Sequence, residues 1–287
     1  MSWAKFKRLS SSKDLSIFRR GTTASDGGGG GGPVPLLDTN PGASVAYSLR
    51  LLSSSYNGSA IRVRRSSDNA EQDIGFSGGI LDTASLLSFC GAGSGYVTTW
   101  YDQSGNGEDN IQATLLAQPT IVTSGNLETI NSLPAIYYPS GTFTATPLRN
   151  IAAQSIFTVA QIVTYSQLQS LVSFDLYPPW IRSISPNYYR TPSTGAVNVD
   201  DFTYNNGAMY FNGSLHSVTD SFLNSHILSS FANSAWTGKK FAISDATGLS
   251  RWMLGKMSEC IVYPTSQESG YRSAIEADMS THYLISI

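Results

Sequence analysis

Six consecutive glycines, from Gly27 to Gly32, impose the strongest constraint on how this 287-residue chain folds. Glycine has no side chain to bury and loses the most backbone entropy on ordering, so a run of six behaves as a flexible coil. The other residues of 21–35 are mostly small or are prolines, and they offer little that would pack. The sequence therefore predicts an extended N-terminal arm over 1–20, a flexible linker over 21–35, and one folded domain over 36–287.

The N-terminal arm is strongly basic. Residues 1–20 contain six lysines and arginines against one carboxylate, Asp14, so the arm carries a net charge of +5 and the remaining chain −7. Such a cationic segment attracts nucleic-acid phosphates, and it is equally suited to an acidic socket on another protein. We expect a protein socket, with nucleic acid as the less favoured partner.

Several functional classes are disfavoured by what the sequence lacks. No segment has the apolar length of a secretion signal or of a membrane span, so we expect no membrane association and folding where the chain is made. Cys90 and Cys260 lie far apart and are predicted to be buried free thiols. The histidines at 216, 226 and 282 show no spacing typical of metal ligands. We expect neither a metal site nor a cofactor.

The composition of the domain favours an all-β fold. Only 13% of residues are charged, whereas tyrosine, threonine and valine suit pleated sheets and glycine, asparagine and serine supply turns. Short strands separated by turn residues are typical of an antiparallel β-sandwich. We expect strands at 61–64, 95–101, 135–138, 155–164, 169–174, 208–211, 226–231, 240–243 and 255–263.

Short helices are predicted at three places. Apolar residues recur at helical spacing over 46–56, and Asp82 is placed to cap a helix over 82–89. A capping-box sequence at 265–268 predicts the start of an amphipathic helix that packs on the sheet. Its apolar stripe is expected to contain Tyr271, Ala274, Ile275 and Met279.

The most informative motif is Tyr-Asp-Gln-Ser-Gly-Asn-Gly, which starts at Tyr101 directly after a predicted strand. A turn here would bring Asp102, Gln103 and Asn106 side by side, next to Trp100. Planar polar groups that bind hydroxyls, together with an aromatic face, suit a sugar, so we predict these four residues as sugar contacts. The alternative is that Asp102 and Asn106 bond to the backbone of their own turn and that Trp100 lies in the core.

Two further residues, Asp175 and Trp180, are predicted as sugar contacts. Trp180 follows two prolines and precedes two tyrosines, Tyr188 and Tyr189, which suggests an exposed aromatic platform. Packing in the core or in a subunit contact is the alternative for this tryptophan.

Two segments of the sequence resemble a known family. Residues 46–82, which include Ile-Arg-Val-Arg-Arg-Ser-Ser-Asp from Ile61, and the motif at 101–107 look like the catalytic domain of B-type fungal α-L-arabinofuranosidases. The resemblance implies a concanavalin-like (jelly-roll) β-sandwich that hydrolyses arabinofuranosides with retention, through a glutamate nucleophile and an aspartate acid/base. The run Ile261–Pro264 and the helix after it resemble laminin-G-like lectin domains of the lectin/glucanase kind, which implies the same fold.

The resemblance assigns the acid/base role to Asp245. No glutamate occurs between Glu128 and Glu259, where the resemblance places the nucleophile. A retaining glycosidase needs two carboxyl groups about 5–5.5 Å apart, and the local substitutes are Asp200 and Asp201. These three aspartates are the catalytic candidates. Because the glutamate is missing, we predict binding of a glycan in preference to its hydrolysis.

Together these features predict a glycan-binding protein on the surface of a phage or similar virion, assembled in the host cytoplasm. The arm would attach to a capsid or tail protein, and the lectin-like domain would swivel on the linker and bind a host-surface glycan. Many copies raise the avidity of a weak sugar site, so we expect a homo-oligomer, with a trimer favoured. The alternatives are an active arabinofuranosidase-like glycoside hydrolase acting on host polysaccharide, and a purely structural decoration protein.

Overall fold

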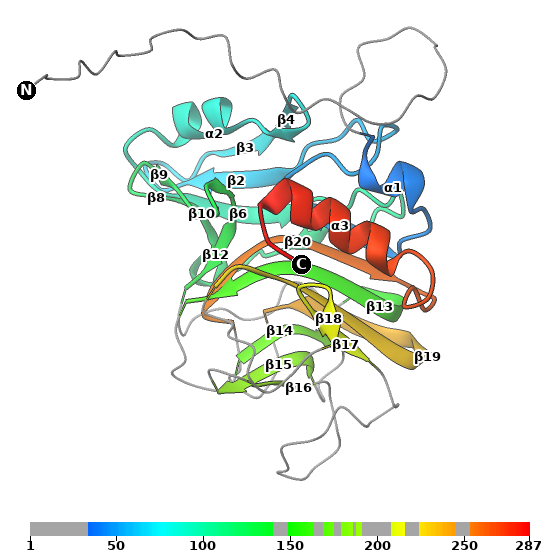
Figure 1. Cartoon of the computed structure of the whole chain (residues 1–287). Helices are drawn as coiled ribbons and strands as arrows, with labels where there is room; N and C mark the ends of the chain where they lie inside the picture. The colour runs from blue at the N-terminus through cyan, green and yellow to red at the C-terminus, as the bar shows by residue number, and fades with distance from the viewer. Residues whose placement is uncertain are drawn as a thin grey trace, which may run out of the picture. The chain divides into compact units, whose positions relative to one another are not determined.

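The computed structural model describes residues 34–139, 149–163, 169–174, 179–185, 188–190, 208–215, 224–244 and 253–287. β-strands dominate these segments, and the helices are few and short (Figure 1). The helices are α1 (Leu36–Thr39), α2 (Thr83–Cys90), α3 (Arg272–Tyr283) and the 3-10 turn η1 (Leu115–Ala117). The strands are β1 (Val45–Ser48), β2 (Ile61–Arg65), β3 (Glu71–Ile74), β4 (Phe76–Ser77), β5 (Ile80–Leu81), β6 (Gly95–Trp100), β7 (Asn110–Ile111), β8 (Thr120–Thr123), β9 (Asn126–Leu127), β10 (Thr129–Ile130), β11 (Leu133–Pro134), β12 (Ile136–Tyr138), β13 (Arg149–Ile162), β14 (Gln169–Phe174), β15 (Pro179–Ser185), β16 (Tyr188–Arg190), β17 (Met209–Phe211), β18 (Ser214–Leu215), β19 (His226–Ile243) and β20 (Gly255–Tyr263).

In the described part of the chain, 16 strands join in one hydrogen-bonded sheet. Its main path runs β16-β15-β14-β19-β13-β20-β12-β8-β6-β2-β3, and β1 adds to β20. The strand pairs are antiparallel, including the long ladders of β13 with β19 and with β20. This arrangement confirms the predicted all-β antiparallel sandwich with few helices.

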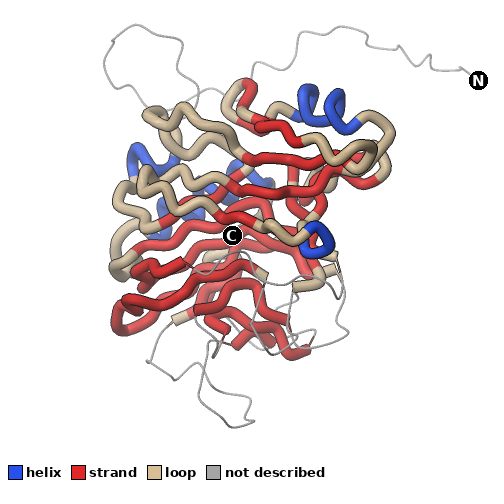
Figure 2. The backbone as a smooth tube through the Cα atoms, turned by 180° about the vertical axis from the view of Figure 1, so that it is seen from behind, coloured by secondary structure: helices blue, strands red, loops and turns tan. Residues whose placement is uncertain are grey.

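The sandwich has two apolar cores. The larger lies between the two halves of the sheet and includes Val63 of β2 and Val97 of β6 together with Ile156 of β13 and Phe241 of β19. The smaller lies on the outer face of β13, β19 and β20, beneath α1 and α3. Figure 2 shows the same strands from the opposite side. Alternate residues of a strand therefore enter different cores, as the period of two requires.

Most predicted strands are present with small differences at their ends. The strands at 169–174 and 255–263 have the predicted bounds. The strands predicted at 226–231 and 240–243 are parts of the single long strand β19, which pairs with β13 through two register shifts. Such irregularities let a long strand bend with its partner.

The helix predicted over 46–56 is wrong. Val45–Ser48 instead forms β1, whose four residues are all buried and pair with Glu259–Val262 of β20. Ala46 faces the outer core and Tyr47 the inner core. The apolar spacing that suggests a helix reflects a strand buried on both faces, and only the pairing with β20 distinguishes the two.

The helix predicted from Asp82 is confirmed as α2. The Asp82 carboxylate accepts a hydrogen bond of 3.0 Å from the backbone N–H of Ser85, which satisfies one of the free N–H groups at the start of a helix. Gly91 follows the last residue with a φ of +58°, a conformation that glycine adopts at low cost.

The C-terminal helix is present, but the predicted capping box does not open it. Helix α3 begins at Arg272, and the backbone N–H of Gln267 donates to the hydroxyl of Ser155, 112 residues away in the sequence. The apolar face of α3 is formed by Ile275, Met279 and Tyr283, which enter the outer core. Tyr271 and Ala274 of the predicted stripe are exposed.

Glu276 is a buried carboxyl on α3, and we expect its replacement to stabilise the protein. Burial raises the pKa of Glu276, and the neighbouring Ser229 and Arg272 offset this only in part. A raised carboxyl pKa in the folded state disfavours folding once the pH exceeds the ordinary value, because the charge must then be buried. Glu276→Gln should therefore raise the free energy of unfolding at pH 7 by on the order of 1 kcal/mol or less, and the unfolding temperature should rise with it.

The gain from Glu276→Gln should disappear near pH 4, where both proteins carry a neutral group at this position. Thermal unfolding followed by circular dichroism at the two pH values measures it. Glu71→Gln on the exposed edge strand β3 is the matched control and should change little. A variant of Glu276 that unfolds at a lower temperature at pH 7 would contradict the expectation.

Candidate functional site

The motif at 101–107 forms the connection between β6 and the short strand β7. Strand β7 pairs back onto β6, with Trp100 opposite Asn110. The connection lies beside β1, because the N–H of Gln103 donates to the carbonyl of Ala46 at 2.8 Å. The motif is therefore placed at the junction of two strands that lie far apart in the sequence.

Asp102 is 4% exposed, and both of its oxygens accept hydrogen bonds. Oδ1 accepts from the backbone N–H of Ala46 at 2.8 Å and of Ser104 at 2.9 Å. Oδ2 accepts from the Ser104 hydroxyl at 2.7 Å and from the backbone N–H of Glu108 at 3.2 Å. A carboxylate with this many protein donors has little capacity left for a ligand.

Gln103 is likewise buried, at 2% exposed, and its side-chain amide bonds to backbone groups. Its Oε1 accepts from the N–H of Leu52 at 2.8 Å, and its Nε2 donates to the carbonyls of Ser48 and Arg50 at 3.1 and 3.0 Å. These bonds satisfy backbone groups at the end of β1 and in the residues that follow it.

Asn106 lies on the surface, and its amide donates to the carbonyls of Ala43 and Ser44 at 3.1 and 3.0 Å. Trp100 is 2% exposed, stands 5.8 Å from the ring of Tyr47, and belongs to the inner core. The core position of Trp100 and the bonds of Asp102 within its own turn agree with the alternative interpretation. Asn106 differs from it, because its amide bonds to the distant residues 43 and 44. A role of these residues as sugar contacts stays a prediction.

A small hollow adjoins Trp100. Its wall consists of Val97, Thr98, Trp100, Asn110, Gln112, Pro119, Ile136 and Tyr138. The indole N–H of Trp100 has no hydrogen-bond partner among the described residues. The hollow has a volume of only about 10 Å³, far below the usual size of a ligand pocket. It is too small for an oligosaccharide.

The remaining predicted site residues lie outside the described part of the chain. This applies to the catalytic candidates Asp245, Asp200 and Asp201 and to the predicted sugar contact Asp175. The backbone of Trp180 is described as part of β15, but its side chain is not. The roles of these five residues stay predictions.

All six glutamates of the chain lie among the described residues, at 71, 108, 128, 259, 268 and 276. Glu128 forms an ion pair with Lys256 at 2.9 Å, and Glu276 forms one with Arg272 at 2.9 Å. Glu71 lies near Arg62, and Glu268 accepts a hydrogen bond from the hydroxyl of Tyr210. Glu259 is fully buried, so it cannot reach a substrate.

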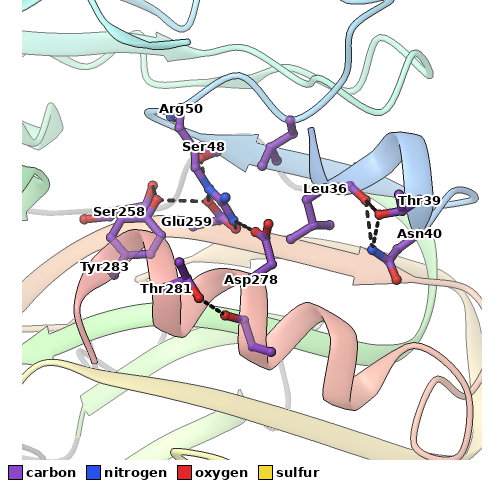
Figure 3. Close-up of polar contacts among 12 residues, drawn as sticks. Leu36, Thr39, Asn40, Ser48, Arg50, Ser258, Glu259, Asp278, Thr281 and Tyr283 are labelled. Atoms are coloured by element: carbon purple, nitrogen blue, oxygen red, sulfur yellow. Dashed lines mark hydrogen bonds and ion pairs between the residues drawn. The ribbon is translucent and has the colours of Figure 1, made fainter. Parts of the chain in front are cut away.

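Glu259 lies at the centre of a buried polar network (Figure 3). Arg50 donates to Glu259 from Nε at 2.8 Å and from Nη2 at 3.0 Å, and its Nη2 also lies 2.5 Å from Asp278 of α3. The hydroxyls of Ser48 and Tyr283 donate to Glu259 at 2.7 and 2.9 Å. The network thereby joins β1, β20 and α3.

This network is not among the sites predicted from the sequence, although the sequence contains a signal for it. Arg50 and Glu259 are isolated charges in apolar surroundings, Ser-Leu-Arg-Leu-Leu and Ser-Glu-Cys-Ile-Val. A charge within a buried segment needs a partner of opposite sign. The two residues are 209 positions apart, so the sequence shows that each needs a partner but not which.

The described residues hold neither a metal-binding cluster nor a membrane-spanning helix. They contain no cluster of three or more histidine, cysteine or acidic side chains that would hold a metal ion. Among the helices of these segments, none combines the length and apolarity needed to cross a bilayer. Cys90 and Cys260 are both free and buried, as predicted.

Comparison with known proteins finds similarity in the first half of the domain. Residues 38–132 match the family model described as α-L-arabinofuranosidase B, catalytic. The probable α-L-arabinofuranosidase B of Aspergillus fumigatus is 34% identical over 102 residues, which is 34% of this chain and 20% of that protein. The α-L-arabinofuranosidase B of Aspergillus oryzae is 34% identical over 97 residues, 32% of this chain and 19% of that protein. The chain therefore spans about a fifth of the length of the curated relatives it matches.

Solved structures of arabinofuranosidases are less similar in sequence to this chain than these relatives are. A crystal structure of an arabinofuranosidase complexed with arabinofuranosyl-α-1,2-xylobiose has a TM-score of 0.47 and 16% identity, covering 87% of this chain and 64% of that chain. An α-L-arabinofuranosidase soaked with a cyclic sulfate inhibitor has a TM-score of 0.42 and 14% identity at the same coverage. The segment that matches the family model, 38–132, includes the loop of Asp102 and Gln103 and none of the predicted catalytic aspartates.

Proposed function

We propose that this chain is a carbohydrate-active domain of the arabinofuranosidase kind, which hydrolyses α-L-arabinofuranosidic bonds in a glycan. The observation that carries the proposal is the match of residues 38–132 to the catalytic model of α-L-arabinofuranosidase B. Within that segment, Asp102 and Gln103 bond to the backbone of β1 and of the residues after it. We therefore propose hydrolysis in preference to glycan binding alone, which is the function that the missing glutamate suggests.

The proposed reaction uses the aspartates named from the sequence. Asp245 protonates the glycosidic oxygen as its bond to the anomeric carbon breaks, while Asp200 or Asp201 attacks that carbon and forms an ester. Water then adds to the anomeric carbon, its proton passes to Asp245, and the aspartate is released. We choose an aspartate as the nucleophile because three of the glutamates already have partners. Glu259 is fully buried and bonded to Arg50, and Glu128 and Glu276 form ion pairs.

The proposal is tested by release of 4-nitrophenol from 4-nitrophenyl α-L-arabinofuranoside by the full chain. Asp245→Asn should lower kcat by about 10²–10⁴-fold, the usual contribution of a general acid/base. Glu71→Gln, on the exposed β3, is a matched carboxylate control and should keep full activity. The arabinopyranoside with the same leaving group should be a poor substrate.

The result also decides between hydrolysis and binding. A wild-type chain that releases no product but is retarded on an arabinan affinity gel is a binding protein, and the proposed hydrolysis is then wrong. A chain that neither cleaves nor binds leaves the structural decoration role. Residues 1–33 lie outside the described structure, so the protein socket, the oligomer and the virion surface stay predictions.

A further inference from the structure

Trp100 and Asn110 lie opposite each other at the base of the loop 101–109. Strand β6 ends at Trp100 and β7 begins at Asn110, and the two residues are partners in the antiparallel pair of these strands. Side chains of directly opposed residues lie on the same face of a sheet, with their Cβ atoms about 4.5–5.5 Å apart. The side chains of Trp100 and Asn110 are therefore neighbours.

Both side chains are buried without a hydrogen-bond partner in the described part of the chain. Trp100 is 2% exposed, and its indole N–H, which can only donate, has no acceptor there. Asn110 is 5% exposed, and no hydrogen bond joins its side-chain amide to another described residue. Buried polar groups in native proteins are nearly always satisfied, by other protein groups or by ordered water. Two such groups on neighbouring residues indicate a shared partner that is not a protein group.

The hollow beside Trp100 provides the space for such a partner. Trp100 and Asn110 both belong to its wall, together with Thr98, which is 6% exposed. The hydroxyl of Thr98 donates one long hydrogen bond of 3.4 Å to the carbonyl of Arg62, so its oxygen can still accept a hydrogen bond. The volume of the hollow, about 10 Å³, is roughly the space that one water molecule occupies.

We infer that the hollow binds one water molecule, which joins the indole of Trp100 to the side-chain amide of Asn110. The water oxygen accepts the hydrogen bond of the indole N–H. Its two hydrogens are donated to the amide oxygen of Asn110 and to the hydroxyl of Thr98, which gives the three hydrogen bonds that are usual for a buried water. An ion fits less well, because no charged side chain of the described residues belongs to the wall.

This water links the two ends of the loop that contains the motif at 101–107. The pairing of β6 with β7 is only two residues long, so few backbone hydrogen bonds close the loop. From this loop, Asp102 and Gln103 bond to the backbone of β1 and of the residues after it. The water site is thus part of the structure that holds the motif against β1.

The experiment is nuclear magnetic resonance of the 15N-labelled full chain, with magnetisation transferred from water to the indole N–H protons. The signal of Trp100 is assigned by its loss in Trp100→Phe. We expect a cross-peak between this proton and water whose NOE and ROE have opposite signs, as for a water that stays bound while the protein tumbles. Direct exchange of the indole proton with solvent gives equal signs instead.

Two variants and one addition test where this water lies. Asn110→Leu replaces the amide with an apolar group of similar size and should abolish the cross-peak. Asn126→Leu, in the exposed turn between β8 and β9, is the matched control and should keep it. Excess L-arabinose should leave it unchanged, because the site holds water and not a sugar hydroxyl.

Three results would overturn the inference: no such cross-peak in the wild type, its persistence in folded Asn110→Leu, or its loss when L-arabinose is added. If Asn110→Leu does not fold, the wild-type spectrum decides alone.

Discussion

Replacing Arg50 with methionine is expected to lower the free energy of unfolding by about 3–5 kcal/mol, the usual cost of removing one partner from a buried ion pair. Glu259 is completely buried, and Arg50 is the positively charged group that contacts it. Methionine keeps much of the side-chain volume but leaves the carboxylate without a counter-charge. Urea unfolding followed by circular dichroism measures the loss.

The pH dependence of this effect has a definite sign. Burial alone would raise the pKa of Glu259, but the charge and hydrogen bonds of Arg50 outweigh it and hold the pKa below the ordinary value of 4.5. In the wild type this carboxylate therefore contributes stability above about pH 4.5, and the contribution is lost as the pH falls through the lowered value. In Arg50→Met the unpaired carboxyl should favour its protonated form, so the variant should gain stability as the pH falls from 7 toward 4.

Two controls identify the buried charge as the cause. Arg62→Met removes an exposed ion pair with Asp73 and should cost less than about 1 kcal/mol. Adding Glu259→Gln to Arg50→Met should recover part of the loss, because the buried charge is then gone. Equal losses in Arg50→Met and Arg62→Met, or no recovery in the double variant, would contradict the assignment.

Replacing Asp102 with asparagine is expected to destabilise the domain by about 3 kcal/mol, although the two side chains have nearly the same shape. Both carboxylate oxygens accept hydrogen bonds, so the amide group must face N–H or O–H donors on one side. At least one buried backbone donor then loses its acceptor, and a hydrogen bond to a charged group contributes about 1.5–3 kcal/mol.

The same variant tests the original prediction that Asp102 contacts a sugar. If that prediction held, Asp102→Asn would weaken glycan binding and leave the unfolding transition in place. We expect the reverse: a lowered midpoint in urea and, in the folded fraction, unchanged affinity. Asn106→Ala, in the exposed part of the same loop, should cost less than about 1 kcal/mol.

The elements predicted correctly from the sequence are those whose signals are local. Asp82 caps α2 through its own neighbour Ser85, and the strand at 169–174 ends where it was expected. The false helix over 46–56 and the false capping box at 265–268 fail for one reason. In each case a partner distant in the sequence takes the backbone groups: β20 pairs with β1, and Ser155 binds Gln267.

In the candidate site, too, the local motif can be recognised from the sequence but its distant partners cannot. The motif at 101–107 is conspicuous in the sequence because it combines polar planar groups with an aromatic residue, but the same groups serve a sugar or a backbone equally well. Their acceptors and donors on Ala46, Ser48 and Leu52 lie about 50 residues earlier, and only the folded chain brings them together. Burial then leaves Asp102 and Gln103 almost no access to solvent.

The sequence by itself determined that this domain is an antiparallel β-sandwich, because residue type and turn spacing select strands locally. It also determined that no glutamate is available between Glu128 and Glu259. Only the tertiary structure decided that Arg50 meets Glu259 and that Asp102 bonds to β1. Each of these depends on strand pairings across 50 to 210 residues, and the register of such pairs is set by the packing of the whole sheet.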